Sequence, residues 1–545
     1  MISQGIAKTI SLVALAAIVA VLGLGGCGSS SDAPQDGTLH GVTVTFPDYL
    51  DPALSLSIEG VSAMWNTYLP LLTYVHADGA AGTKLIPGLA RALPRIGDGG
   101  RTYTLFLRQG LRYSDGTPVR ASDFSHEIER VLALSSGGSG FFDDIVGAER
   151  FQETKHGGIA GIRTDDGSGR ITIHLREPSG TFTYELATLF AAPVPGDTPD
   201  EDMTADPPPA TGPYEIVSTR PGRSWEYRRN PEWAAHNAKL LPQLPSGHYD
   251  RIEIDVVTNP QTEVNDVEKG KADWMVNPPP SERIGSLRQD FDEQLVVTPQ
   301  ISVFYFWMNT SAPPFDDVRV RRAVNYAIDP RALARIYAGQ VAPMQQILPP
   351  AMPGHVAYTP FPHDLAKAKE LMAAADPKDR QIDVWTNSYP ANLEAGEYYE
   401  GVLRELGFEP KLKTLDPANY FTVIGNLSTP DLDTGWGNWL LDYPHPNDYF
   451  EPQLTKDGIQ QTNNTNWAQF DDPALSAEVA RLRREPLGPA QKRAYARLDR
   501  EYMRQAPWAP FGTIAFNTFV SSAIEADDVV VSPIYGQDLA SFQPK

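Results

Sequence analysis

The sequence contains a single cysteine, Cys27, among 545 residues. A disulfide framework is therefore impossible, and a cysteine-rich zinc or iron–sulfur site is excluded as well. Basic residues are also scarce: 46 Lys and Arg stand against 68 Asp and Glu, which gives a formal net charge of −22. A duplex-binding protein needs a basic surface, and no run of Lys or Arg supplies one. Nucleic acid is not expected as a partner.

Sequence motifs of the common enzyme classes are absent too. There is no G-x-S-x-G elbow, no H-E-x-x-H and no P-loop. The ten histidines are scattered, and none forms a ligand pair at i, i+3 or i+4. Asp431 and Asp433, just ahead of Trp436, indicate a loop or strand edge rather than an acid–base pair. We expect neither an enzyme nor a metal or cofactor site, although catalysis by residues distant in sequence would leave no such trace.

One long hydrophobic run is present, Ile10–Leu24, which follows Lys8. Its fifteen residues are short for a membrane-spanning helix and suit the apolar region of a signal peptide. Leu24-Gly25-Gly26-Cys27 resembles the bacterial lipobox, in which the cysteine is lipidated and becomes the mature N-terminus. The resemblance implies a signal peptide at 1–26, lipidation of Cys27 and a flexible Gly/Ser tether over 27–37. The alternative is an ordinary secretory signal with a chance cysteine.

The rest of the chain has ordinary globular composition, and its length corresponds to three or four domains at ~150 residues each. Strand and helix patterns alternate along it, so we predict an α/β fold. Predicted strands are 40–46, 103–107, 170–175, 251–257, 272–276, 302–309, 381–386 and 411–414. Predicted helices are 60–69, 121–134, 264–269, 318–328, 364–375, 393–406 and 489–505.

Two segments mark possible boundaries between units. Pro193–Pro213 is rich in proline and acid, and a loop of that length joins units or is a disordered surface insertion. A second boundary is expected near Val297–Ser302, where one strand gives way to an aromatic one.

A set of short motifs occurs in a fixed order from about residue 40 to the end of the chain. They are Leu50–Ala53 (LDPA), Leu85–Ala90 (LIPGLA), Tyr103–Arg108 (YTLFLR), Gly110–Val119 (GLRYSDGTPV), Ala121–Phe124 (ASDF), Thr211–Tyr214 (TGPY), Arg229–Pro231 (RNP), Gly270–Asp273 (GKAD), Asn309–Thr310 (NT), Pro314–Asp317 (PFDD), Val320–Ala323 (VRRA) and Ala327–Asp329 (AID). This ordered set resembles the family 5 solute-binding proteins of ABC importers, the dipeptide- and oligopeptide-binding group.

The resemblance implies a two-lobed clamshell of the periplasmic-binding-protein type (type II), with ligand held between the lobes and closure by a hinge. Lobe I would comprise 38–72, 209–299 and 513–545, with a subdomain inserted at 73–208, and lobe II would comprise 300–512. The implied partners are an ABC permease with its ATPase subunits, and the membrane through the lipid anchor. We expect a monomer held outside the cytoplasm on the bacterial cell membrane.

The site is predicted in Gly435–Asp448 (GWGNWLLDYPHPND). In peptide-binding relatives a similar Trp-x-x-Asp stretch supplies the carboxylate that holds the peptide's α-ammonium, and Trp439 and Asp442 match it. Trp436 and Tyr443 are expected as apolar walls. Alternatively, Asp442 caps a turn while the tryptophans fill the core. His445 stands where many relatives carry a second acid, and it is expected to be a hydrogen-bonded structural residue.

The predicted function is therefore capture of peptides and their delivery to a permease. Because relatives for oligosaccharides, nickel chelates and opines share most of the scaffold, a non-peptide solute is the alternative. A secreted hydrolase acting on peptide or glycan is the remaining one. No arginine in the site segment accounts for the ligand's carboxylate.

Overall fold

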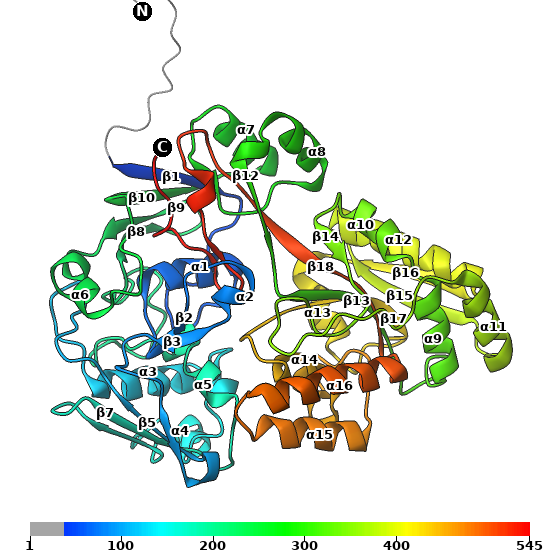
Figure 1. Ribbon diagram of the computed structural model, residues 1–545, viewed down its shortest axis with the longest axis horizontal. Helices are drawn as coiled ribbons and strands as arrows, with labels where there is room; N and C mark the ends of the chain where they lie inside the picture. The colour runs from blue at the N-terminus through cyan, green and yellow to red at the C-terminus, as the bar shows by residue number, and fades with distance from the viewer. Residues whose placement is uncertain (1–36) are drawn as a thin grey trace, which may run out of the picture.

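The computed structural model describes residues 37–545. The predicted signal peptide, Cys27 and nearly all of the tether lie outside the described residues. The chain folds into two lobes side by side (Figure 1), each with its own hydrophobic core. The prediction of a two-lobed α/β protein is confirmed.

Lobe I contains two larger sheets. One is five-stranded, in the order β11-β1-β10-β9-β8, and the other is four-stranded and antiparallel, in the order β4-β5-β7-β6. Its strands are β1 (Thr38–Thr43), β2 (Leu72–Tyr74), β3 (Leu85–Pro87), β4 (Arg95–Gly97), β5 (Thr102–Phe106), β6 (Ile162–Asp165), β7 (Arg170–His174), β8 (Tyr214–Arg220), β9 (Ser224–Arg229), β10 (Arg251–Val256), β11 (Trp274–Met275), β19 (Val531–Ser532) and β20 (Gly536–Gln537).

The helices of lobe I are α1 (Ile58–Thr67), α2 (Gly79–Gly82), α3 (Ala121–Ala133), α4 (Ala148–Thr154), α5 (Phe182–Glu185), α6 (Ala238–Leu240), α7 (Pro260–Glu268) and α8 (Ser281–Asp290). The four-stranded sheet with α3, α4 and α5 forms the lower left part of Figure 1, which we call the small subdomain.

Lobe II is built on one mixed sheet in the order β12-β18-β13-β17-β15-β16, with β14 paired to β18; β12 and the second half of β18 lie at its edge toward lobe I and belong to the connection between the lobes. Its strands are β12 (Leu295–Pro299), β13 (Ser302–Met308), β14 (Val341–Pro343), β15 (Gln381–Asn387), β16 (Glu409–Leu415), β17 (Thr434–Leu440) and β18 (Trp508–Phe519). Its helices are α9 (Val318–Ala327), α10 (Pro330–Ile336), α11 (Leu365–Ala375), α12 (Pro390–Glu405), α13 (Pro417–Ile424), α14 (Asn447–Leu454), α15 (Pro473–Arg483) and α16 (Pro489–Gln505).

Two paired strands connect the lobes. The first half of β18 pairs with β13 inside lobe II, and its second half pairs antiparallel with β12, from Ala515 to Phe519. The next residue, Val520, forms a bridge to Trp274 of β11 in lobe I. The ladder of β12 and β18 therefore runs from one lobe into the other, as the long orange strand in Figure 1 shows.

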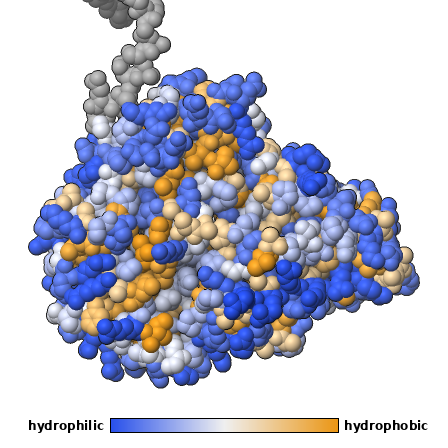
Figure 2. All heavy atoms as spheres, viewed as in Figure 1, coloured by the Kyte–Doolittle hydropathy of each residue, from blue (hydrophilic) through white to orange (hydrophobic). Residues whose placement is uncertain are grey.

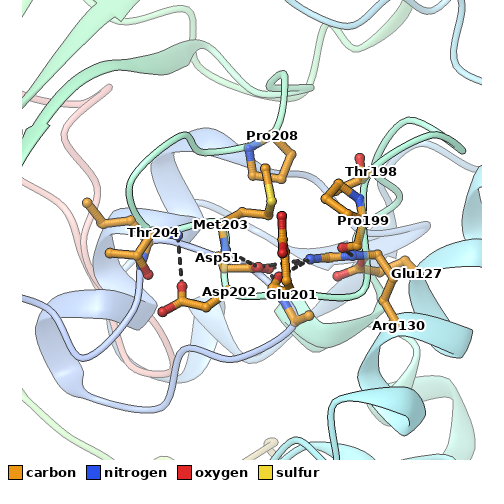
Figure 3. A network of polar contacts seen from close by, with 12 residues as sticks. Asp51, Glu127, Arg130, Thr198, Pro199, Glu201, Asp202, Met203, Thr204 and Pro208 are labelled. Atoms are coloured by element: carbon orange, nitrogen blue, oxygen red, sulfur yellow. Dashed lines mark hydrogen bonds and ion pairs between the residues drawn. The ribbon is translucent and has the colours of Figure 1, made fainter.

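The proline-rich segment 193–213 is an ordered strap on lobe I (Figure 3). The guanidinium of Arg130 on α3 donates from Nε to the carbonyl of Pro199 at 2.9 Å. It also forms ion pairs of 2.9 Å with Asp51 and Glu127, and all three side chains are fully buried. The N–H of Met203 donates to Asp51 at 3.1 Å. The segment connects the small subdomain to β8, so the alternative of a disordered insertion is wrong.

The visible surface is largely hydrophilic (Figure 2). Hydrophilic residues cover most of this face, and the larger hydrophobic patches on it lie over lobe I (Figure 2). Among residues 37–545, no helix combines the length and apolar character needed to cross a membrane.

Candidate functional site

The segment predicted to carry the site runs from a strand through a turn into a helix. Its first half is β17, which lies between β13 and β15 in the lobe II sheet. The chain turns through Pro444 and Pro446, and α14 begins at Asn447. Asp448 occupies the first turn of α14, where free N–H groups and the helix dipole favour a carboxylate. The turn carries Asp442 to the edge of lobe II that faces the small subdomain.

Trp436 is not brought to this edge. It is 3% exposed in the core of lobe II, and its Nε1–H donates to the hydroxyl of Tyr337 at 2.9 Å. Its ring packs edge-on against Phe304. Trp436 and Trp439 are three residues apart on a strand, and such residues point to opposite faces.

Trp439 instead is connected to the site by a hydrogen bond. Its Nε1–H donates to Oδ2 of Asp448 at 3.2 Å. The backbone N–H of Asp442 donates to the same oxygen, also at 3.2 Å. The carboxyl groups of Asp442 and Asp448 are close enough for each to shift the pKa of the other. Asp448 is 2% exposed, whereas the side chain of Asp442 is accessible.

A cavity of about 370 Å³ lies at this place, between lobe II and the small subdomain. That volume is within the ~300–1,000 Å³ typical of small-ligand sites. Its lining residues from lobe II are Asp442, Tyr443, Asp448, Glu451, Pro452, Asp457, Gly458, Gln460, Thr465 and Arg483, and those from the small subdomain are Gly140, Phe141 and Glu185. Within the described chain, five carboxyl groups therefore face the cavity against one guanidinium.

A larger cavity, of about 520 Å³, lies elsewhere on lobe II, among residues of α9, α11 and α16. None of the predicted site residues lines it. We take the smaller cavity as the candidate site because it lies between the lobes and contains the predicted carboxylate.

Aromatic side chains join the two lobes beside the cavity. Tyr443 is 8% exposed, and its ring lies 6.2 Å from Phe141 and 6.3 Å from Tyr184, both in the small subdomain. The ring of Tyr184 also meets His445 edge-on at 5.3 Å. Tyr443 therefore forms part of an aromatic wall that belongs to both lobes.

His445 is fully buried, and its Nδ1 accepts a hydrogen bond from the N–H of Asn447 at 3.1 Å. Burial lowers its pKa to about 3, so the ring is neutral at physiological pH. Its Nε2 has no hydrogen-bond partner among the described residues. His445 thus shapes the turn, and it adds no positive charge to the site.

Burial raises the pKa of three carboxyl groups of the cavity. Burial raises the pKa of Asp442 to about 6, an effect partly opposed by the hydrogen bond with Asp448. The accessible surface of Asp442 faces the cavity. Protein on both sides of the cavity therefore still removes much of the water around its carboxyl group. Burial, and next the charge of Asp442, raise the pKa of Asp448 well above its usual value. Burial also raises the pKa of Glu185 to about 7.

The one cation that lines the cavity within residues 37–545 is already paired. Nη2 of Arg483 lies 2.7 Å from Asp144 of the small subdomain, and Nη1 lies 3.3 Å from Glu451 of α14. The carbonyl of Arg483 accepts a hydrogen bond of 2.6 Å from the N–H of Gly180, again across the lobes. Arg483 therefore connects the lobes at the rim of the site.

A buried hydroxyl of lobe I faces the same region. Tyr74 is 1% exposed, and its hydroxyl has no hydrogen-bond partner among the described residues. Burial is the main cause that raises its pKa. Ionisable neighbours from both lobes raise it further, namely Tyr535, Tyr184, Tyr443 and Asp448. An unpaired buried hydroxyl costs free energy, and Tyr74 is not among the residues that line the cavity.

The sequence prediction missed most of this environment. Asp448 was part of the segment singled out, six residues after Asp442, and could have been chosen for its charge. Phe141, Glu185 and Arg483 carried no signal, because only tertiary folding brings them to the cavity. The described residues contain no group of three or more His, Cys, Asp and Glu side chains placed to hold a metal ion.

Comparison with known proteins gives a consistent result. Residues 84–461 match the model of the bacterial extracellular solute-binding proteins, family 5 (middle region). Haem-binding protein A of Haemophilus influenzae is 26% identical and aligns over 84% of both chains. Oligopeptide-binding protein OppA of Bacillus subtilis is 24% identical over 83% of this chain and 84% of its own. The solved structure of clavulanic acid biosynthesis oligopeptide binding protein 2 has a TM-score of 0.84 at 24% identity, and covers 94% of this chain and 96% of that one.

Proposed function

The chain belongs to family 5 of the bacterial extracellular solute-binding proteins, and we propose that it captures peptides between its two lobes and delivers them to an ABC permease. Proteins of this family bind solutes rather than catalyse reactions. The proposal goes beyond the family in two respects: the ligand is a peptide, and Asp442 holds its α-ammonium group.

One observation carries the proposal. Asp442 presents a carboxylate to the cavity between the lobes, and no Lys, Arg or His among the described residues forms an ion pair with it. A desolvated anion needs a paired cation, and the α-ammonium of a peptide supplies one. Charge-assisted hydrogen bonds of this kind contribute ~1.5–3 kcal/mol.

The same observation separates the ligands named by the relatives. An acidic cavity with no free cation among its described residues suits an ammonium group and repels the propionates of haem. Two proteins similar to this chain are named as oligopeptide-binding. Tyr443 and the rings of the small subdomain would form the apolar wall, with Trp439 fixing Asp448 behind Asp442; Trp436 would support them from the core.

We also propose a lipid anchor at Cys27, a monomeric state and the lobe boundaries 38–72, 209–299 and 513–545 for lobe I, 73–208 for the inserted subdomain and 300–512 for lobe II. The anchor rests on the apolar run and the lone cysteine. Replacing it, Cys27→Ser, should leave an uncleaved precursor or release soluble protein that still binds ligand. Wild-type protein that is wholly soluble, with a free thiol at Cys27, would end this part of the proposal.

Peptide binding is tested in two steps. Native mass spectrometry of freshly purified protein should detect a co-purified peptide, and a mixed peptide pool should be returned unchanged, whereas a hydrolase would return fragments. Binding of a free and an N-acetylated peptide is then measured for wild type and Asp442→Asn. Removing one partner of a buried charge pair costs ~2–4 kcal/mol, or roughly 30- to 1,000-fold in affinity.

The two changes should not add. Acetylation removes the ammonium, so it should weaken binding to wild type strongly and to Asp442→Asn much less. If Asp442→Asn binds both peptides as wild type does, Asp442 is not part of the binding site. Unfolding of the variant would instead support the turn-cap alternative.

A further inference from the structure

Asp448 is a second carboxyl group at the proposed ammonium site, and its position is fixed. Two N–H groups donate to its Oδ2, one from the ring of Trp439 and one from the backbone of Asp442, each at 3.2 Å. The contact of the Asp442 backbone with Asp448 brings the two carboxyl groups together at the cavity, where each shifts the pKa of the other.

Other charged groups around the pair do not neutralise it. Glu185 and Glu451 are acids of the same cavity, and the guanidinium of Arg483 is paired with Asp144 and Glu451. Tyr74, Tyr443 and Tyr449 also face the pair, and burial is the main cause that raises the pKa of each, so all three remain neutral hydroxyls. The pair therefore lies in an acidic environment, and no cation of the described chain forms an ion pair with it.

Two carboxyl groups in contact cannot both ionise cheaply in such a place, and their titration belongs to the pair rather than to either residue. Without ligand the pair binds one proton and has one negative charge. An ammonium group brought between the two oxygens provides the missing positive charge, so the second carboxyl can ionise.

Building on the proposed function, we infer that Asp442 and Asp448 act together as a proton-exchanging receptor for a primary ammonium group. The singly protonated pair binds R–NH3⁺, the shared proton passes to water, and the doubly ionised pair holds the cation. No covalent bond forms or breaks apart from this O–H bond. Peptide capture then releases about one proton, and affinity rises with pH over the range in which the pair loses it.

Calorimetric titration tests this with tri-alanine as the probe. Binding enthalpies are measured at pH 6.5 in several buffers of different ionisation enthalpy, and the slope gives the number of protons released. Wild type should release close to one. Asp448→Asn retains an oxygen for the two N–H donors but binds no shared proton, so release should fall to a few tenths while affinity changes less than about tenfold.

Asp527→Asn is the control, because Asp527 is exposed and does not line the cavity. It should release as many protons as wild type. The inference is overturned if wild type binds tri-alanine without releasing a proton. It is also overturned if Asp448→Asn releases as many protons as wild type.

Failure of peptide binding itself is recognised separately. Aspartate carboxyl carbons labelled with ¹³C are titrated in the unliganded protein, where the midpoint of Asp448 should fall in Asp442→Asn, because the charge of Asp442 raises the pKa of Asp448. If tri-alanine does not bind but the midpoint falls, the peptide proposal fails and the carboxyl pair is supported. An unchanged midpoint contradicts the pair whatever the ligand.

Discussion

Two clusters of carboxyl groups differ in this protein: the cluster in lobe I is fully buried, and the pair between the lobes combines the buried Asp448 with the accessible Asp442. Asp51 and Glu127 flank Arg130 at 2.9 Å each, and all three side chains are fully buried. Asp442 and Asp448 also lie side by side, but no cation of the described chain pairs with them. The first cluster also fastens the strap 193–213 to α3 (Figure 3).

The difference shows how the same residue type acquires two roles. Buried carboxylates need a counter-charge. Where the chain supplies that charge, the cluster supports the fold, and where it does not, the cluster is left to bind a cation from outside. Substitutions that exchange or remove the counter-charge should therefore affect stability in the first cluster and binding in the second.

The largest effect is expected from Arg130→Met. It removes the cation that pairs with both Asp51 and Glu127, and breaking a buried ion pair on one side costs ~3–5 kcal/mol. The free energy of unfolding, measured in urea, should fall by that amount. Arg228→Met is the control, since its 2.7 Å pair with Glu215 is exposed on the arginine side and such pairs contribute at most ~1 kcal/mol. Equal stability of the two variants would remove the distinction between buried and exposed pairs.

A lysine introduced beside Asp448 should give the pair between the lobes a counter-charge from the chain itself, as Arg130 does for Asp51 and Glu127. Asp442→Lys places an ammonium beside Asp448 and repels the ligand's own ammonium, since like charges brought together cost several kcal/mol. Affinity for tri-alanine should fall by about 4 kcal/mol, or roughly 1,000-fold, while the unliganded variant stays folded. Fluorescence titration measures the affinity. The loss should exceed that of Asp442→Asn; an equal loss would mean that only the missing anion matters.

Closure of the lobes is expected to matter for binding and not for the fold of either lobe. A Cβ added at Gly180 would overlap the carbonyl oxygen of Glu485 in lobe II, which is backbone and cannot give way easily. Gly180→Ala should weaken peptide binding by ~1–3 kcal/mol, the usual cost of overpacking, with little change in unliganded stability. Gly140→Ala, beside the same cavity but with no atom within 4 Å of its added Cβ, is the control. Solution scattering should show that the Gly180→Ala variant remains wider than wild type when peptide is present.

The smallest effect is a pH-dependent gain of stability in the unliganded protein. The raised pKa values of Asp442 and Asp448 mean that the folded protein binds more protons than the unfolded chain. Their contribution is present below about pH 4 and is lost as pH rises through about 6 and beyond. Asp448→Asn removes this loss, so its free energy of unfolding should exceed wild type by about 1 kcal/mol at pH 8, the equivalent of one pKa unit. The two proteins should be equally stable at pH 4; a gain at both would point to another cause.

Much of the fold followed from local patterns. The apolar spacing of 318–328 predicted α9, because this helix buries one face in the core. The aromatic run at 302–309 predicted β13, because both faces of this strand are buried. β18 was not predicted, because Pro510 and Gly512 interrupt its pattern. α14 was missed as well, and it contains Pro452 in its interior.

The site was predictable only in part. Asp442 was identified because Trp439–Asp442 resembles the Trp-x-x-Asp stretch of peptide-binding relatives, and the structure places it at the cavity. Trp436 was expected there too, but strand alternation sends it to the core. The partnership of Asp442 with Asp448 depends on a turn through two prolines, whose path neither helical nor strand periodicity gives.

The paired strands β12 and β18 impose a mechanical limit on any opening of the molecule. Their hydrogen-bonded ladder extends from Leu295 paired with Phe519 to Pro299 paired with Ala515, and the chain of β18 continues without a break into the lobe II sheet. A ladder of this kind can twist and bend, but its rungs prevent one strand from sliding along the other. The junction therefore allows the lobes to change their relative orientation by twisting or bending, while it opposes sliding of one lobe past the other. A membrane protein that contacts both lobes would then meet a surface whose shape depends on that orientation.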